Sequence, residues 1–135
     1  MSTTYMGEST DIEKVERRLA FRMLVPSYLP PDTAIVSGRW WSAGEVVEIH
    51  TRTETSDRLR GRITIKQWTD AGAASARTGA PNHGKKRRIG HNVWAVSDGP
   101  PFIFEGRVGR INVQVFSLFS QDETALVAGS LVAPN

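Results

Sequence analysis

The chain has 135 residues, of which 39% are apolar and 23% charged, and its net charge is +3 at pH 7. This composition is typical of one globular domain and excludes a wholly disordered chain. The absence of cysteine excludes a disulfide scaffold, a thiolate metal site and a cysteine nucleophile. The apolar runs are only a few residues long, so no segment that spans a bilayer is expected.

A flexible N-terminus is expected over residues 1–9, followed by a single domain over residues 10–132. Thr10-Asp11-Ile12-Glu13 has the form of a capping box and predicts a short helix from about Asp11 to Arg18. Residues 21–25 form a compact apolar run that fits a strand, because Pro26 favours extended backbone before it.

From residue 33 onward the pattern predicts strands and turns. Apolar and polar residues alternate, or apolar residues cluster between turn signals, over 34–41, 45–53, 60–68 and 93–96, and over a last pair, 102–104 and 108–119, that turns across Gly106. Strands joined by short polar turns predict an antiparallel sheet of about six strands.

The end of the chain predicts a second helix. Ser120-Gln121-Asp122-Glu123 is another capping box, and the helix is expected to run from about Gln121 to Leu131. Leu126, Val127 and Leu131 are expected to cover the sheet, whose strands have one apolar and one polar face. The fold class is therefore α+β, with a short N-terminal helix, an antiparallel sheet and a C-terminal helix.

Residues 70–86 are predicted to form a long mobile loop. This stretch contains no large apolar side chain, so it cannot bury enough surface to offset the entropy lost when it becomes ordered.

Several short motifs resemble a known family. The motifs are Val25-Pro26-Ser27-Tyr28-Leu29-Pro30-Pro31, Ile63-Thr64-Ile65-Lys66-Gln67, Gly90-His91-Asn92-Val93-Trp94 and Ser130-Leu131. The chain resembles, over roughly residues 10–132, the extracytoplasmic domain of unknown function found at the C-terminus of bacterial anti-sigma factors and in some lipoproteins. The resemblance implies an envelope-facing module with a curved sheet similar to that of lipoprotein carriers, and it implies no catalytic residues. Unlike members of that family, the chain is expected to carry neither an anti-sigma region nor a membrane anchor.

Positive charge is concentrated between residues 58 and 91, which hold nine basic residues and one acidic residue. The densest part, Lys85-Lys86-Arg87-Arg88, is a candidate anion-binding run, because four adjacent cations on a loop attract the phosphates of nucleic acid or of an anionic lipid surface. A solubilising loop that protects a neighbouring strand from edge pairing explains the same charges. Sequence-specific reading of nucleic acid is not expected, because no helix-turn-helix, zinc-finger or RRM pattern is present.

Four tryptophans are candidates for an aromatic platform: Trp40, Trp41, Trp68 and Trp94. Adjacent residues of a strand point to opposite faces, so one of Trp40 and Trp41 should lie in the core and the other on the open face of the sheet or under a loop. An exposed ring on a sheet can bind a lipid, a sugar or a peptide. Burial in the core is the more common position of tryptophan.

Motifs for catalysis and metal binding are not found. The spacings of His50, His83 and His91 match no common set of metal ligands. The sequence contains no Gly-x-Ser-x-Gly, dinucleotide-binding or Walker motif. We therefore expect a protein that is not an enzyme and that uses no metal or cofactor.

Two functions stay open. The first is a non-enzymatic, envelope-associated module for sensing, ligand binding or scaffolding, with a protein partner or a lipid-like ligand. The alternative is an intracellular basic accessory protein that contacts nucleic acid non-specifically, or a larger assembly, through residues 58–91. No apolar stretch follows a basic start, so no signal peptide is expected. Location is open between extracytoplasmic, as the resemblance implies, and a trimmed or cytoplasmic chain.

Overall fold

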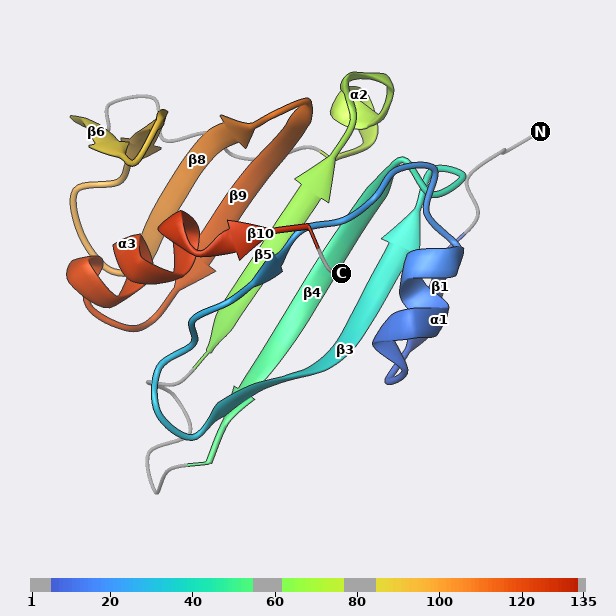
Figure 1. Ribbon diagram of the computed structural model, residues 1–135, viewed down its shortest axis with the longest axis horizontal. Coiled ribbons are helices and arrows are strands. Elements are labelled where there is room, and N and C mark those ends of the chain that lie inside the picture. The colour runs from blue at the N-terminus through green and yellow to red at the C-terminus, as the bar shows by residue number, and fades with distance from the viewer. Residues whose placement is uncertain (1–5, 55–61, 77–84, 134–135) are drawn as a thin grey trace.

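An eight-stranded antiparallel sheet forms the body of the molecule (Figure 1). The computed structural model describes residues 6–54, 62–76 and 85–133. Across the sheet the strands follow the order β1-β3-β4-β5-β9-β8-β7-β6. Their bounds are β1 Gly7–Ser9, β3 Thr33–Trp41, β4 Val46–Thr53, β5 Ile63–Trp68, β6 Lys85–Ile89, β7 Asn92–Val96, β8 Phe102–Val108 and β9 Ile111–Ser117. The α+β class is confirmed, and the sheet has more strands than the predicted number.

The two additional strands, β1 and β6, are the outermost strands of the sheet. β1 has only three residues, and β6 reads Lys-Lys-Arg-Arg-Ile, so neither shows the alternation of apolar and polar residues that marks a half-buried strand. An outermost strand pairs on one side only and is often polar. This explains why the pattern of the sequence did not predict them.

The predicted turn across Gly106 is wrong, because Gly106 lies inside β8, in register with Val113 of β9. The turn lies instead after Val108, where Gly109 has a positive φ of 62°. Gly106 is needed within the strand, since a Cβ there would lie 2.9 Å from ring atoms of Trp94. The glycine therefore marks close packing and not a chain reversal.

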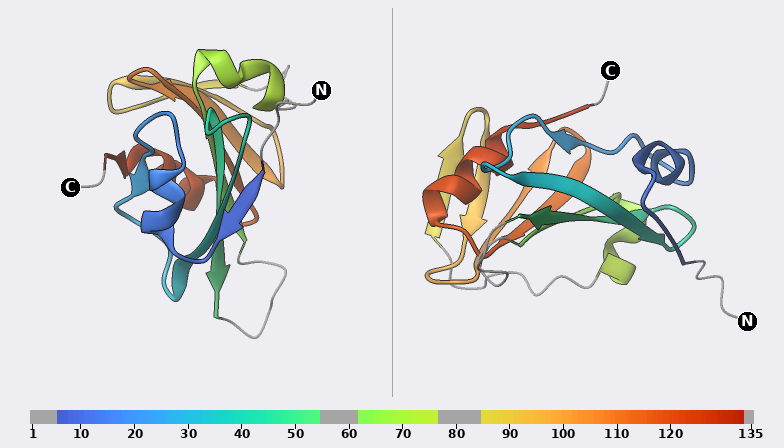
Figure 2. Two further views of the ribbon diagram at one scale, coloured as in Figure 1. Left: turned by 90° about the vertical axis from the view of Figure 1, so that its right-hand side faces the viewer. Right: turned by 90° about the horizontal axis from the view of Figure 1, so that it is seen from below.

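One face of the sheet is covered by segments from both ends of the chain. Helix α1 (Ile12–Arg17), the segment that includes β2 (Val25–Pro26), helix α3 (Gln121–Gly129) and β10 (Leu131–Val132) all lie on this side, and the sheet bends around α3 (Figure 2). β2 and β10 pair with each other as a second, two-stranded sheet. A strand was predicted over residues 21–25, but only Val25 of this range is in one. Its partner is the two-residue strand β10 and not the main sheet, so the pairing extends no further.

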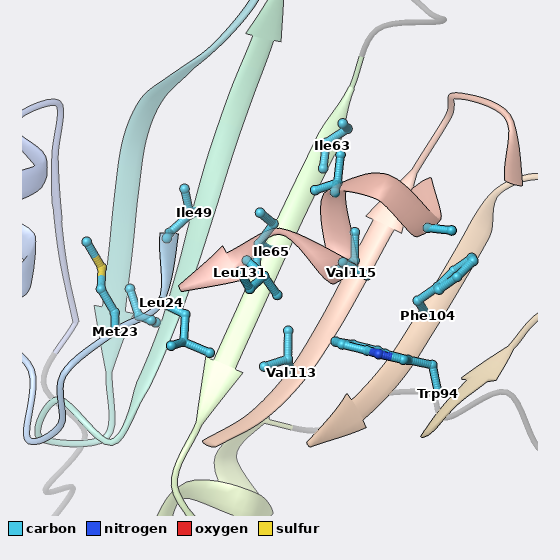
Figure 3. Close-up of a cluster of buried hydrophobic side chains, with 14 of the residues drawn as sticks. Met23, Leu24, Ile49, Ile63, Ile65, Trp94, Phe104, Val113, Val115 and Leu131 are labelled. Atoms are coloured by element: carbon cyan, nitrogen blue, oxygen red, sulfur yellow. The ribbon is translucent and has the colours of Figure 1, made fainter. Parts of the chain in front are cut away.

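The main hydrophobic core fills the space between the sheet and this cover (Figure 3). Its buried members are Val15, Met23, Leu24, Trp40, Val47, Ile49, Ile63, Ile65, Trp94, Val96, Phe104, Val113, Val115, Ala125, Val127, Ala128 and Leu131. Leu126, which was expected to cover the sheet, is instead 54% exposed. The helix turns about 100° per residue, so Leu126 points away from the face that Ala125 and Val127 bury.

One polar side chain lies in the middle of this core. Gln67 of β5 is fully buried, and its side-chain amide forms two hydrogen bonds of 2.7 Å with the backbone of Leu24: Oε1 accepts from the Leu24 N–H and Nε2 donates to the Leu24 carbonyl. The amide thus replaces the strand partner that the covering segment lacks at this point. Buried peptide groups need such a partner.

Both predicted helix starts are found, with one shift. Ser120 is the N-cap of α3 and accepts from the Glu123 N–H, as the second capping box predicts. In α1 the N-cap is Asp11, which accepts from the backbone N–H groups of Glu13 and Lys14, and not Thr10. Helix α3 ends at Gly129, before the predicted end at Leu131, because Leu131 pairs with Pro26 in β10.

The loop predicted over residues 70–86 is wrong at both of its ends. A 3-10 helix, η1 (Asp70–Gly72), and helix α2 (Ala73–Ala76) follow β5, and Lys85 and Lys86 already belong to β6. Small residues suffice here because Ala76 packs against Val46 and Trp68, in a small cluster on the face opposite the main core. Residues 77–84 lie outside the described residues, so the mobility of this part stays a prediction.

Candidate functional site

The cationic run lies on the last strand of the sheet. In β6, Lys85 and Arg87 are in register with the buried Val96 and Trp94 of β7, so both point to the covered face. Lys86 and Arg88 alternate with them and point to the outer face. The four cations therefore line both sides of one edge instead of forming a single charged loop.

β6 also presents backbone hydrogen-bonding groups. It pairs with β7 on one side, and within residues 6–54, 62–76 and 85–133 no strand pairs with its other side. In an antiparallel strand, alternate residues direct their N–H and C=O groups to opposite sides. The free side of β6 can therefore hydrogen-bond to another extended chain, while its charges disfavour a second copy of the same cationic strand.

A groove of about 370 Å³ runs between this edge and helix α3. It is lined by Arg87, Arg88 and Ile89 of β6 and by Asp122, Ala125 and Leu126 of α3. Ile89, Ala125 and the half-exposed Leu126 give the groove an apolar floor, and the charged side chains form its rim. This arrangement suits a chain segment that offers an apolar side chain to the floor and acidic groups to the rim.

The charges of the rim are only weakly engaged within the molecule. Arg87 Nη1 lies 3.7 Å from Asp122 Oδ1, and the Asp122 side chain is 91% exposed. An ion pair this open to water contributes little to stability. The rim therefore keeps a surplus of positive charge toward solvent.

Helix α3 is fixed in place by contacts away from the groove. The Tyr28 hydroxyl donates to Glu123 Oε2 at 2.8 Å, and this hydrogen bond raises the pKa of Tyr28 above its ordinary value of 10.0. The backbone N–H of Ser27 donates to the Ser130 carbonyl at 2.9 Å. Both contacts join α3 and its end to the connection after β2, so the groove has a firm wall.

The predicted aromatic platform is not formed. Trp40 and Trp94 are buried in the main core, and Trp68 is buried in the small cluster with Ala76. Trp41 lies on the opposite face from Trp40 and beneath α2, as expected for adjacent residues of a strand. Its Nε1 donates to the Ser75 carbonyl at 3.1 Å.

The ring of Trp41 is also contacted by two cations. The guanidinium of Arg39 and the ammonium of Lys66 lie 5.4 Å and 5.7 Å from the ring centroid. Such cation–π contacts occupy the ring with groups of the protein itself. Trp41 is therefore a packing residue of the outer face.

An ion network around Glu48 occupies the outer face next to Trp41. Glu48 Oε1 lies 2.9 Å from Arg39 Nη2 and 3.0 Å from His50 Nε2, and Oε2 lies 3.9 Å from Lys66 Nζ. A small depression of about 210 Å³ borders this network. The charge of Glu48 is thus balanced by its neighbours. We interpret the network as pairs of opposite charges that stabilise adjacent strands.

The remaining histidines are dispersed. His91 lies exposed in the turn between β6 and β7, and His83 lies outside the described residues. In the part of the chain that the structure describes, no three metal-ligating side chains come together. In the same part, no helix has the length and apolar character to cross a membrane.

A second pKa shift marks the base of α2. Asp70 accepts from Asn112 Nδ2 at 3.0 Å and from Arg107 at 3.3 Å. These hydrogen bonds and the Arg107 charge lower the pKa of Asp70 below its ordinary value of 3.8. The contacts tie η1 to the strand pair β8–β9.

In comparisons with known proteins, no family model, curated protein or solved structure matches the chain. The candidate site therefore depends on its own geometry.

Sequence reasoning identified half of this site. It singled out Lys85, Lys86, Arg87 and Arg88 but not the α3 residues that face them, because Ala125 and Leu126 looked like parts of a covering helix. The one signal in the sequence was that Leu126 follows Ala125 and precedes Val127, so these three apolar residues cannot all lie on one face of a helix. The structure shows that Leu126 is the one left out, with 54% of it exposed.

Proposed function

We propose that the protein is a non-enzymatic binding module that takes an acidic segment of a partner protein in the groove between β6 and α3. The observation that supports this proposal best is the groove itself, in which Arg87 and Arg88 border an open strand edge and an exposed Leu126, while Lys85 and Lys86 continue the same cationic strand. The resemblance to the extracytoplasmic domain of anti-sigma factors and lipoproteins supports a role in the cell envelope.

The packing beneath the cover of the sheet favours a protein partner over a lipid-like ligand. The covered side of the sheet is filled by Met23, Leu24 and Leu131, which pack against Ile65 and Val113 of the sheet (Figure 3). A lipid would have to displace this packing, at a cost of about 1.5–3 kcal/mol for each large side chain exposed. The groove at the sheet edge is open without any such change.

The charge of the groove favours an acidic partner. Opposite potentials steer association and discriminate against partners of the wrong sign more than they add affinity. These attractions are screened beyond about 8 Å at physiological ionic strength, so binding should weaken as salt rises.

The test is a fluorescence-anisotropy titration with two labelled twelve-residue peptides that differ only in charge, one with glutamate and valine and the other with lysine and valine. We expect the wild type to bind the acidic peptide and not the basic one. Changing Lys85, Lys86, Arg87 and Arg88 together to Gln should abolish this binding.

A matched control separates the location of the charge from the net charge. Lys14, Arg17, Arg18 and Arg110 are all exposed and lie outside β6 and α3, so changing these four to Gln removes the same charge elsewhere. This variant should bind the acidic peptide nearly as well as the wild type at physiological salt. Equal loss in both fourfold variants would contradict the proposed site.

The same titration addresses the intracellular alternative. Two unrelated DNA duplexes replace the peptides. A nucleic-acid role predicts that the logarithm of the binding constant falls with the logarithm of the salt concentration, with a slope of about −0.9 for each phosphate contacted. Lys66, one of the basic residues in 58–91, already contacts the Ala76 carbonyl and Glu48, so it is held by the protein itself. Duplex binding tighter than acidic-peptide binding would favour the alternative over our proposal.

A further inference from the structure

We infer that the acidic segment binds by strand addition, extending the sheet beyond β6 with alternating acidic and apolar residues. This inference rests on the proposed function and specifies how its ligand is recognised. Three features of the edge lead to it: the backbone lines the groove, the two faces of β6 differ in chemistry, and a second copy of the chain is disfavoured.

The lining of the groove points to the backbone. Arg87, Arg88 and Ile89 are consecutive residues of one strand, and their side chains alternate between the two faces of the sheet. Because the side chain of Arg88 points to the outer face, Arg88 reaches a groove shared with Arg87 and Ile89 through its backbone or around the free edge of the strand. A ligand in the groove therefore meets the free N–H and C=O groups of β6, which an extended chain satisfies by pairing.

The two faces of the edge set the side-chain pattern of the ligand. Side chains of an added strand that share the outer face with Lys86 and Arg88 meet two cations, so acidic residues fit there. A side chain between them shares the covered face with Lys85, Arg87 and Ile89. On this face the Arg87 charge lies 3.7 Å from Asp122, and Ile89, Ala125 and Leu126 form the floor, so an apolar residue fits there. The recognised pattern is acidic–apolar–acidic, repeated along the strand.

Length and charge define the occupant further. β6 has five residues, about 16 Å of extended chain, so a ligand segment of about five to seven residues covers it. The β6 edge of a second copy would bring Lys85, Lys86, Arg87 and Arg88 against the same four cations, and the other outermost strand, β1, has only three residues to offer. Such like-charge pairing is a known means of preventing edge-to-edge association. The occupant is therefore an acidic segment of a different protein.

The experiment uses peptides of identical composition in the same anisotropy assay. An alternating Glu-Val peptide is compared with a block peptide in which the glutamates precede the valines. We expect the alternating peptide to bind at least tenfold more tightly, because only it presents acidic groups to one face and valines to the other.

N-methylation of the peptide backbone tests the hydrogen bonds. Two versions of the alternating peptide carry N-methyl groups at every second residue, in the two opposite phases. Because an added strand pairs with β6 on one side only, one phase should weaken binding on the order of tenfold or more and the other should change it less than threefold. In parallel, alternate amides of β6 should exchange with solvent more slowly when the unmodified peptide is bound.

A matched pair of variants tests the floor of the groove. Leu126→Ser removes the exposed apolar side chain of α3, and Val132→Ser removes one of similar exposure in β10, outside the groove. Leu126→Ser should weaken the alternating peptide about fivefold to tenfold, and Val132→Ser should leave it unchanged. Both side chains are about half exposed, so both variants should fold.

The outcomes separate the inference from the proposed function. If the alternating and block peptides bind equally and neither phase of N-methylation matters, strand addition is overturned while an acidic binding site remains. If no acidic peptide binds at low salt, the proposed function fails and the inference fails with it.

Discussion

The hydrogen bonds of Gln67 make a quantitative prediction about what holds the cover on the sheet. In a Gln67→Met variant the side chain keeps its length and loses both hydrogen bonds to Leu24. The N–H and C=O of Leu24 then stay buried without partners, at a cost of about 1–3 kcal/mol each, while the apolar methionine regains on the order of 1–2 kcal/mol by burial. We expect a net loss of about 2.5 kcal/mol in the free energy of unfolding.

Urea unfolding followed by tryptophan fluorescence measures this loss. The midpoint should fall with little change in the slope, because the native surface stays the same. Gln114→Met is the matched control: Gln114 is on the adjacent strand β9, in register with Lys66, and its side chain lies on the outer face. That variant should stay within about 0.5 kcal/mol of the wild type.

A loss below about 1 kcal/mol for Gln67→Met would refute the reasoning. It would mean that the backbone at Leu24 finds other partners when the amide is removed, so that hydrophobic contacts alone hold the covering segment. A loss of the same size in Gln114→Met would show instead that any change of amide to thioether in the sheet has this effect.

Two further predictions concern the far end of the sheet. Gly106→Ala should destabilise the fold by about 1–3 kcal/mol, because its Cβ would lie 2.9 Å from the Trp94 ring, whereas Gly99→Ala, with open space around it, should be neutral in the same urea assay. Asp70 should titrate below 3.8 when its carboxyl carbon is followed by NMR, and Asn112→Ala should move this pKa back toward 3.8. Because folding lowers the pKa of Asp70, its contribution to stability is complete above the ordinary pKa and is lost as the pH falls through the lowered value; an unshifted Asp70 would contradict the prediction.

The central strands could be predicted from the sequence because each buries one face. Alternation placed strands over 34–41, 45–53 and 60–68, and the structure has β3, β4 and β5 there. β6 escaped prediction because an outermost strand buries little, so its side chains carry no periodic signal. Gln67 escaped as well, since a polar residue at an apolar position of the pattern gives no indication of a partner 43 residues away.

The candidate site required knowledge of which elements lie side by side. The charge of Lys85, Lys86, Arg87 and Arg88 was evident in the sequence, but whether it belonged to a loop or a strand edge depended on pairing with β7. The groove further required α3, which follows β6 in the chain by more than thirty residues. Local propensity carries no information about such a juxtaposition.

The pairing of β2 with β10 has a consequence for the synthesis of the protein. Because the cover of the sheet is built from both ends of the chain, the apolar face stays open until the segment that contains Leu131 has left the ribosome. The sheet strands are complete well before that point, so a nascent chain passes through a stage in which paired strands expose an apolar surface. The emergence of residues 131–132, and not the completion of β9, is then the step that closes the cover over the sheet.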